Sequence, residues 1–304
     1  MTPPLAHKED RPGFAILLSI LGGISVTIMN GFAKAASSDF DPIETVFYRG
    51  LLALALLSVY ILATGQQGRL KTNRPKVHLL RSFVGTVSVC LVYWSYALMP
   101  MANATALLMT SGLIITGLSV PLLKEHVGLI RWSAVILGFI GALIITKPTG
   151  ADFNVTGTIV CFVAAFTIAS VALLLRSLGR SEEPLATIYY FMVFSVVASG
   201  LYVAIFKDFS VPRAALPVLA GVGIFSLVQQ FFKTHAAVLA EASILSPYSY
   251  LTLIWAVIIG VIFWGDWPEL NVWIGSALII GANLVVLWRE QRKKKKLAST
   301  CELS

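Results

Sequence analysis

The chain consists of long apolar segments separated by short polar turns. A helix that crosses the hydrocarbon core of a bilayer needs about 20 mainly apolar residues, and ten segments of roughly that length can be distinguished. They cover residues 13–34, 42–63, 78–99, 101–123, 129–147, 155–176, 185–206, 214–236, 241–264 and 270–289. This pattern predicts an all-α membrane protein with ten transmembrane helices.

The ten segments fall into two halves that resemble each other weakly. The fourth segment region reads MANATALLMTSGLIITGLSV and the ninth reads LAEASILSPYSYLTLIWAVI, and both open with small residues. Five helices per half is an odd number, so the second half would enter the membrane in the opposite direction. We therefore expect two inverted five-helix repeats, residues 13–147 and 155–289, with the substrate site near the midplane where they meet. A polar tail (1–12) precedes them and a basic tail (290–304) follows.

Composition excludes a soluble domain. Hydrophobic residues make up 57% of the chain and charged residues only 12%, against about 25% charged in ordinary soluble domains. A soluble chain of 304 residues has too little interior to bury so much apolar surface. The surrounding solvent is therefore expected to be lipid.

Positive charge is distributed as in a membrane protein and not as in a nucleic-acid-binding protein. With both termini in the cytoplasm, 18 of the 23 Lys and Arg residues fall in cytoplasmic segments, four fall outside, and Arg49 lies within a span. The positive-inside rule therefore predicts cytoplasmic termini in a bacterial inner membrane, and it supports an even number of helices. The lysines of the basic tail would contact anionic lipid headgroups, and no nucleic-acid partner is expected.

Arg49 is the strongest candidate for substrate binding. It lies about seven residues, or roughly 10 Å, into the second segment, where ionisable groups are costly and usually functional. Its guanidinium could face a carboxylate or phosphate in a cavity, or it could extend to the membrane surface for structural reasons. Glu44 is five residues away, which makes it a poor same-face partner.

The eighth segment supplies further polar candidates. Lys233 could be a second cationic contact on the substrate path or could extend to the cytoplasmic surface. His235 is closer to the segment end, where a structural or interfacial role is favoured over proton transfer. Gln229, and Asn30 in the first segment, must find partners inside the bundle, either on other helices or on a ligand.

Aromatic residues form a second group of candidates. They are Tyr48 beside Arg49, Tyr93 and Trp94 in the third segment, and Tyr248 and Tyr250 in the ninth. Such residues could line a cavity for an amphipathic metabolite, although Trp and Tyr also gather at membrane interfaces. Pro247 would interrupt the ninth helix and could serve as a hinge or pocket wall.

Several stretches resemble one known family. They are ETVFYRGLLAL, HLLRSFVG, YALMPMANATALLMTS, LSVPLLKEHVGLIRWSAVILGFIGALIITKP and AEASILSPYSYLTLIWAVIIGVIFWGD. Together they resemble the EamA-type ten-helix carriers of the drug/metabolite transporter superfamily over residues 13–289. Two positions differ from the usual pattern: Gly112 replaces a proline, leaving a flexible point in the fourth helix, and Asp266 replaces a glutamate. The resemblance implies transport of amino acids, riboflavin, S-adenosylmethionine, opine-type metallophores or nucleotide sugars.

A secondary transporter that moves a small polar or amphipathic metabolite by alternating access is therefore the favoured function. A membrane-embedded enzyme would need paired catalytic groups at one depth, and a channel would need a continuous polar path, and neither is visible in the sequence. The three cysteines, Cys90, Cys161 and Cys301, have no metal-ligand spacing, so no cofactor or metal is expected. Assembly as a homodimer is left open.

Overall fold

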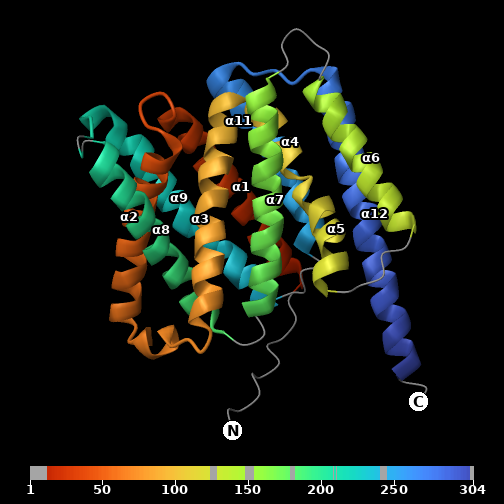
Figure 1. Ribbon diagram of the computed structural model, residues 1–304, viewed down its shortest axis with the longest axis horizontal. Coiled ribbons are helices and arrows are strands. Elements are labelled where there is room, and N and C mark those ends of the chain that lie inside the picture. The colour runs from red at the N-terminus through yellow and green to blue at the C-terminus, as the bar shows by residue number, and fades with distance from the viewer. Residues whose placement is uncertain are drawn as a thin grey trace.

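The computed structural model describes residues 12–123, 129–147, 154–178, 182–207, 209, 211–239 and 245–301. These residues form a bundle of roughly parallel and antiparallel helices, and none of them is in a β-strand (Figure 1). We call the end of the bundle at which α1 and α3 begin the lower end, and the end at which α1 finishes the upper end, as they lie in Figure 1.

The helices follow the apolar segments closely. The first half holds α1 (Pro12–Ala36), α2 (Pro42–Ala63), α3 (Pro75–Leu98), α4 (Met101–Leu108), α5 (Ser111–Leu123) and α6 (Leu129–Thr146). The second half holds α7 (Val155–Leu178), α8 (Pro184–Phe206), α9 (Leu216–Leu239), α11 (Leu251–Trp264) and α12 (Leu270–Cys301). Short 3-10 turns lie at η1 (Gln66–Leu70), η2 (Arg213–Ala215) and η3 (Ser246–Tyr250).

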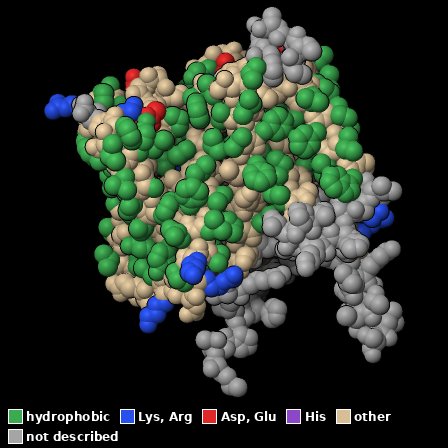
Figure 2. Space-filling model, in the orientation of Figure 1, with side chains coloured by type: hydrophobic (Ala, Val, Ile, Leu, Met, Phe, Trp, Pro, Cys, Tyr) green, Lys and Arg blue, Asp and Glu red, His purple; other side chains and the backbone are tan. Residues whose placement is uncertain are grey.

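The helices have the length and polarity of membrane spans. Within the described residues, eight helices are long and apolar enough to cross a bilayer, and two shorter apolar helices cover Met101–Ile115 and Trp132–Thr146. Hydrophobic side chains cover the middle of the surface in Figure 2, while charged side chains lie at its edges: Lys and Arg without Asp or Glu along the lower edge, and both kinds at the upper left. The protein is therefore an all-α integral membrane protein, as the apolar pattern predicts.

Two spans are not continuous α-helices. The fourth span is broken by a turn at Met109 and Thr110, which separates α4 from α5. In the ninth, the 3-10 turn η3 precedes α11, which starts at Leu251. Pro247 is the second residue of η3, so the irregular backbone lies where the sequence predicts an interruption, and the missing N–H of Pro247 removes no hydrogen bond from α11.

Packing relates the two halves by an approximate two-fold axis. The first helix of each half packs on the third helix of the other, so α1 lies against α9 and α7 lies against α3. The equivalent helices α2 and α8, α4 and α11, and α6 and α12 also pair with one another. This exchange of partners is what two inverted five-helix repeats require.

The pair α6 and α12 is joined by a backbone contact between two glycines. A Cβ added to Gly141 would lie 2.6 Å from the Gly275 carbonyl oxygen, and a Cβ added to Gly275 would lie 2.4 Å from the Gly141 carbonyl oxygen. Helices in membranes approach this closely only where residues are small. The two glycines therefore hold the last helix of one half against that of the other.

Candidate substrate site

Arg49 extends from α2 toward α9 inside the bundle. Its Nε atom donates a hydrogen bond of 3.0 Å to Oγ of Ser226, a residue of α9 that is almost fully buried. Its guanidinium carbon lies 5.8 Å from the centre of the Tyr93 ring on α3. The side chain thus meets groups from two other helices, α9 and α3, and it contacts the second half of the protein directly.

Arg49 has no carboxylate partner among the described residues. Glu44 instead accepts a hydrogen bond from the Asp41 backbone N–H and, with the Asp41 side chain, caps the start of α2. Glu44 also lies 3.3 Å from the amino group of Lys207 on α8. Because Glu44 is used at the helix end, the charge of Arg49 remains available to a ligand.

A narrow pocket lies beside Arg49. It has room for little more than one water molecule, far less than the roughly 300 Å³ at which ligand pockets begin. Its walls come from α2, α8 and α9, and are formed by Val46, Arg49, Gly50, Ala53, Phe191, Met192, Ser195 and Ser226. A metabolite would therefore need the helices to separate further before it could enter.

Two buried polar atoms near this site lack a well-formed hydrogen bond to any described residue. The Tyr93 side chain is only 2% exposed, and its hydroxyl lies close to the Arg49 guanidinium without meeting the distance and angle of a hydrogen bond. Asn30 on α1 donates from Nδ2 to the Tyr96 hydroxyl, 3.2 Å away, and its Oδ1 has no partner. Tyr96 in turn is 3.1 Å from Oγ1 of Thr105. Unpaired buried groups are costly, so Tyr93 and Asn30 remain candidates for ligand contacts.

Arg81 is a candidate that the sequence reasoning missed. The charge count placed it with the cytoplasmic cations because it lies near the start of the third segment. It lies inside α3, is 7% exposed, and stacks its guanidinium over the Phe191 ring at 4.2 Å. Counting the residues between the start of the helix and Arg81, as was done for Arg49, would have shown that Arg81 also lies well inside its span.

The candidates on α9 have different surroundings. Lys233 lies seven residues, or two helical turns, beyond Ser226, so both are on the same side of α9. Gln229 is half-buried, with its backbone packed near Gly22 of α1. His235 is exposed. Its Nδ1 donates a hydrogen bond of 2.9 Å to the Phe231 carbonyl oxygen, and its ring packs on the Phe231 ring. His235 therefore lies outside the pocket.

Two aromatic candidates lie away from Arg49's pocket. Trp94 is 45% exposed and continues the outward-facing apolar stripe of Leu80, Phe83 and Val87 on α3, so it faces lipid. Tyr48 packs at the upper end against Phe40 and Phe47, with ring centres 5.8 Å and 5.2 Å apart. Neither side chain lines the pocket.

The remaining candidates lie in the two interrupted spans. Tyr248 and Tyr250 are half-buried in η3, which packs against α1, and Pro247 beside them is exposed. Gly112 lies just after the break between α4 and α5. A Cβ there would lie 2.2 Å from Oδ1 of Asn283 on α12. Gly112 therefore permits a close contact between the halves, and none of the four residues lines the pocket beside Arg49.

Ion pairs join the two halves at the upper end. They are Lys34 with Asp266 at 2.8 Å, Lys207 with Asp41 at 3.1 Å, and Lys147 with Glu269. Lys34 also lies over the Trp264 ring, 4.9 Å from its centre, so Trp264 does more than mark the membrane interface. Each pair takes one residue from each half, which closes this end of the bundle.

The Asp41–Lys207 pair is insensitive to pH in the neutral range. Burial raises the pKa of Asp41, but hydrogen bonds from Glu44, Lys207 and Tyr202 outweigh it and hold that pKa below 3.8. Hydrogen bonds to Asp41 and Glu44 raise the pKa of Lys207 above 10.5. The stability that Asp41 contributes is lost only when the pH falls below its lowered pKa. The stability that Lys207 contributes is lost only when the pH rises above its raised pKa.

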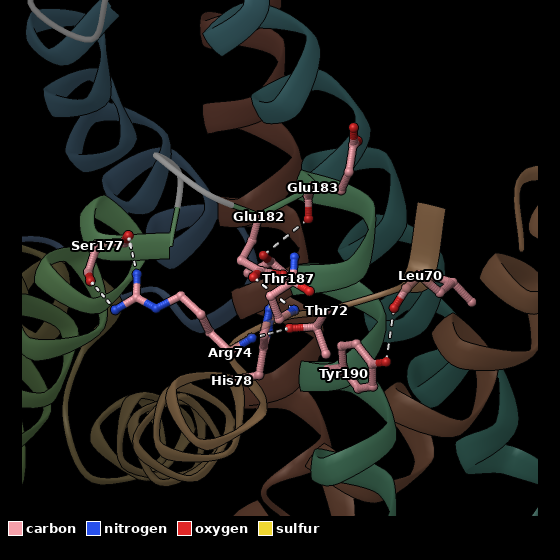
Figure 3. Close-up of polar contacts among 10 residues, drawn as sticks. Leu70, Thr72, Arg74, His78, Ser177, Glu182, Glu183, Thr187 and Tyr190 are labelled. Carbon is pink, nitrogen blue, oxygen red and sulfur yellow. Dashed lines mark hydrogen bonds and ion pairs between the residues drawn. The ribbon is translucent and has the colours of Figure 1, made fainter. Parts of the chain in front are cut away.

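A buried pair joins the halves at the lower end. Glu182, between α7 and α8, accepts a hydrogen bond from the Asn73 backbone N–H at 3.2 Å and lies 3.3 Å from Nε2 of His78. Both side chains are almost fully buried. Burial raises the pKa of Glu182, but hydrogen bonds from Thr72, His78 and Asn73 hold it below 4.5. Figure 3 shows Glu182, Thr72 and His78 close together, with Tyr190 beside the His78 ring.

Further contacts reinforce the lower end. Arg69 pairs with Glu183 at 2.7 Å, and Arg74 donates hydrogen bonds to the carbonyl and hydroxyl oxygens of Ser177 (Figure 3). Polar contacts therefore cross between the halves at both ends of the protein. Among the described residues there is no group of acidic, histidine or cysteine side chains that could hold a metal ion.

Two inverted helical halves around a buried polar site, with closures at both ends, define a membrane transporter for small molecules. The sequence pattern of the EamA-like transporter family matches residues 13–147 and again residues 155–288. The chain belongs to this family, within the drug/metabolite transporter superfamily.

Characterised relatives match the chain over nearly its whole length. It is 29% identical to a riboflavin transporter of Vibrio cholerae, over 95% of this chain and 98% of the relative. It is 28% identical to an S-adenosylmethionine uptake transporter of Rickettsia prowazekii, over 93% and 94%. It is 26% identical to a pseudopaline exporter of Pseudomonas aeruginosa, over 89% and 95%. These relatives differ in cargo and in direction.

A solved structure shares the fold. A crystal structure with 18% sequence identity superimposes with a TM-score of 0.64, covering 91% of this chain and 98% of the other. This likeness shows a shared fold, while the family match is what shows a small-molecule transporter.

Proposed function

We propose that the protein carries a small amphipathic metabolite with carboxylate, phosphate or carbonyl oxygens by alternating access, and that Arg49 binds those oxygens. The supporting observation is a guanidinium at membrane depth that is positioned by Ser226 and has no carboxylate partner among the described residues. Such a group, in a low dielectric, attracts acceptors strongly, and its planar fork suits paired oxygens.

The charge of the site favours some cargoes over others. Arg49, Arg81 and Lys233 are on helices that surround the same region, and no acidic residue lines the pocket. S-adenosylmethionine has one carboxylate that these groups would attract, but its sulfonium and ammonium cations, which give it a net positive charge, would be repelled. Riboflavin is neutral, has a flat ring with carbonyl oxygens, and would find aromatic surfaces in Tyr93 and Phe191. We therefore infer that riboflavin, or a compound with net negative charge, fits the site better than S-adenosylmethionine does.

Transport would require the two halves to rock about this site. The polar contacts at the upper and lower ends would open alternately, and the pocket would widen when one end opens. We propose that the lower end faces the cytoplasm of a bacterial inner membrane, because the basic loops lie there (Figure 2). Lipid headgroups would then contact the basic lower edge.

The proposal can be tested with purified protein in two steps. A thermal-shift screen with riboflavin, S-adenosylmethionine, amino acids and dicarboxylates first identifies stabilising ligands, because binding raises the melting temperature by mass action. Uptake of each hit into proteoliposomes is then compared for wild type and Arg49→Gln. Losing a charge-assisted hydrogen bond, worth about 1.5–3 kcal/mol, should raise KM by about 10- to 100-fold.

Arg213→Gln provides the matched control. Arg213 is an exposed residue of η2 that does not line the pocket, so this variant makes the same chemical change outside the site. Its KM should remain within about twofold of wild type, since surface substitutions rarely have large effects. If Arg49→Gln transported every stabilising ligand as well as Arg213→Gln does, the role of Arg49 in binding would be refuted.

A further inference from the structure

Arg81 points into the membrane and not toward its surface. It lies six residues, or about 9 Å, beyond the first residue of α3. Its Nη1 atom is 3.8 Å from the position that a Cβ on Gly85 would occupy, and Gly85 is one turn deeper, about 15 Å from the helix start. An arginine with a purely structural role near a helix end would extend outward to the headgroups. The guanidinium therefore lies close to the bilayer midplane.

Two donors of the guanidinium are buried and unused. Arg81 is 7% exposed, and neither Nε nor Nη1 has a hydrogen-bond partner among the described residues. Its contact in this region is the face of the Phe191 ring, 4.2 Å away. A cation–π contact leaves the N–H groups at the edge of the guanidinium unused. Leaving such donors unpaired in a low dielectric is costly, unless a ligand supplies acceptors.

A second cation lies near Arg81. Lys233 is on the face of α9 that carries Ser226, two turns nearer the lower end. Ser226 lines the same pocket as Phe191, on which Arg81 stacks. The two positive charges are close enough to repel each other, and Lys233 has no ion-pair partner among the described residues. Lys233 lies deep among the helices, yet part of its surface remains accessible, so a small ion can reach the pair. An anion between them would relieve the repulsion and satisfy the unused donors.

We propose that Arg81 and Lys233 form an anion-binding site in the lower half of the protein, separate from Arg49 and specific for a carboxylate or phosphate group of a soluble ligand. Phe191 joins the two sites, because it stacks on Arg81 and also lines the pocket beside Arg49. This inference rests on the proposed transport function, in which an anionic cargo would occupy one site before the other, but the site itself can be tested by binding alone.

The test is a phosphate titration of purified protein in lipid-free, non-ionic detergent. Inorganic phosphate is added up to about 20 mM at constant ionic strength, and the melting temperature is recorded. Wild type should show a saturable increase. Lys233→Gln changes an exposed side chain and should fold, and Arg81→Lys keeps the charge but loses the planar fork. Each should raise the half-saturating concentration by about fivefold or more, and Arg81→Gln should abolish the saturable response.

Two further variants and one lipid are used to test whether the phosphate response belongs to Arg81 and Lys233. Arg213→Gln should respond as wild type does. Arg49→Gln should also keep the phosphate response, because the pocket beside Arg49 has no room for a phosphate ion unless the helices separate. This variant separates the present proposal from the previous one, even if it no longer transports any cargo. An unchanged response in Arg81→Lys and Lys233→Gln, a loss in Arg49→Gln, or stabilisation by short-chain phosphatidylglycerol but not by phosphate would overturn the proposal.

Discussion

At the scale of single residues, the notable feature is the number of buried polar groups that lack partners. Arg81, Tyr93 and Asn30 each retain at least one buried atom with no hydrogen bond to a described residue, whereas most buried polar groups in proteins are hydrogen-bonded. Arg81 and Tyr93 are on α3, and Asn30 is on α1, which packs against α3. Their arrangement is understandable if a ligand provides the missing acceptors and donors during transport.

Two tyrosines on α3 allow a matched prediction. The Tyr93 hydroxyl has no hydrogen bond, so Tyr93→Phe should leave thermal stability unchanged or slightly higher while weakening binding of the transported ligand. The Tyr96 hydroxyl contacts Asn30 and Thr105, so Tyr96→Phe should cost about 1–3 kcal/mol of unfolding free energy. Melting temperatures and ligand titrations of both variants check this.

The opposite ranking would contradict the prediction. If Tyr93→Phe lost as much stability as Tyr96→Phe and bound ligand normally, the Tyr93 hydroxyl would be a structural group. The comparison is balanced because both changes remove one oxygen from a buried ring on the same helix.

At the scale of helices, the interruptions occur at equivalent places in the two halves. The fourth span of the first half is broken between α4 and α5, and the fourth span of the second half opens with η3. Interrupted helices in corresponding positions of inverted repeats commonly mark the substrate site of transporters. Pro247 and Gly112 mark both positions in the sequence, although the structure shows that Gly112 permits a close contact with Asn283 as well.

The glycine contact between α6 and α12 leads to a second matched prediction. Gly275→Leu would force a side chain against the Gly141 backbone, whereas Gly281→Leu, on the same helix, has open space around it. Overpacking usually costs about 1–3 kcal/mol, and a backbone obstacle leaves little room to adjust. We expect Gly275→Leu to lower the melting temperature and the monodisperse yield, while Gly281→Leu stays near wild type. Equal behaviour of the two variants would show that this contact does not support the bundle.

At the scale of the whole molecule, the contacts between halves act as closures at both ends. Lys34 and Asp266 connect α1 to the turn after α11, and both are largely shielded from solvent. Alternating access requires this contact to break when the upper end opens. Its strength should therefore influence both stability and the rate of transport.

Exchanging the two charges tests this closure. Lys34→Asp alone places carboxylates at both positions, and Asp266→Lys alone places two cations there. Each single variant should lose about 1–3 kcal/mol of stability and transport poorly, because like charges hold the upper end apart. The double variant should recover much of both properties, as a double-mutant cycle of melting temperature and uptake would show. Purely additive losses would indicate that the pair is not a closure.

The sequence by itself was sufficient for the helical, membrane-spanning character of the protein, because twenty-residue apolar segments have few stable alternatives in lipid. The odd number of helices per half led in the same way to inverted repeats. The sequence also pointed to Arg49, because the depth of a charge within an apolar segment can be found by counting residues from the start of that segment.

Only the tertiary structure decided which residues share a site. Trp94 and Tyr93 are neighbours in the chain, yet one faces lipid and the other faces Arg49, because the rotation of each helix is set by its packing partners. The same packing turned Glu44 toward Lys207 and Arg81 toward Phe191. Contacts between residues far apart in the sequence depend on how the two halves pack, and local patterns carry too little information about that packing.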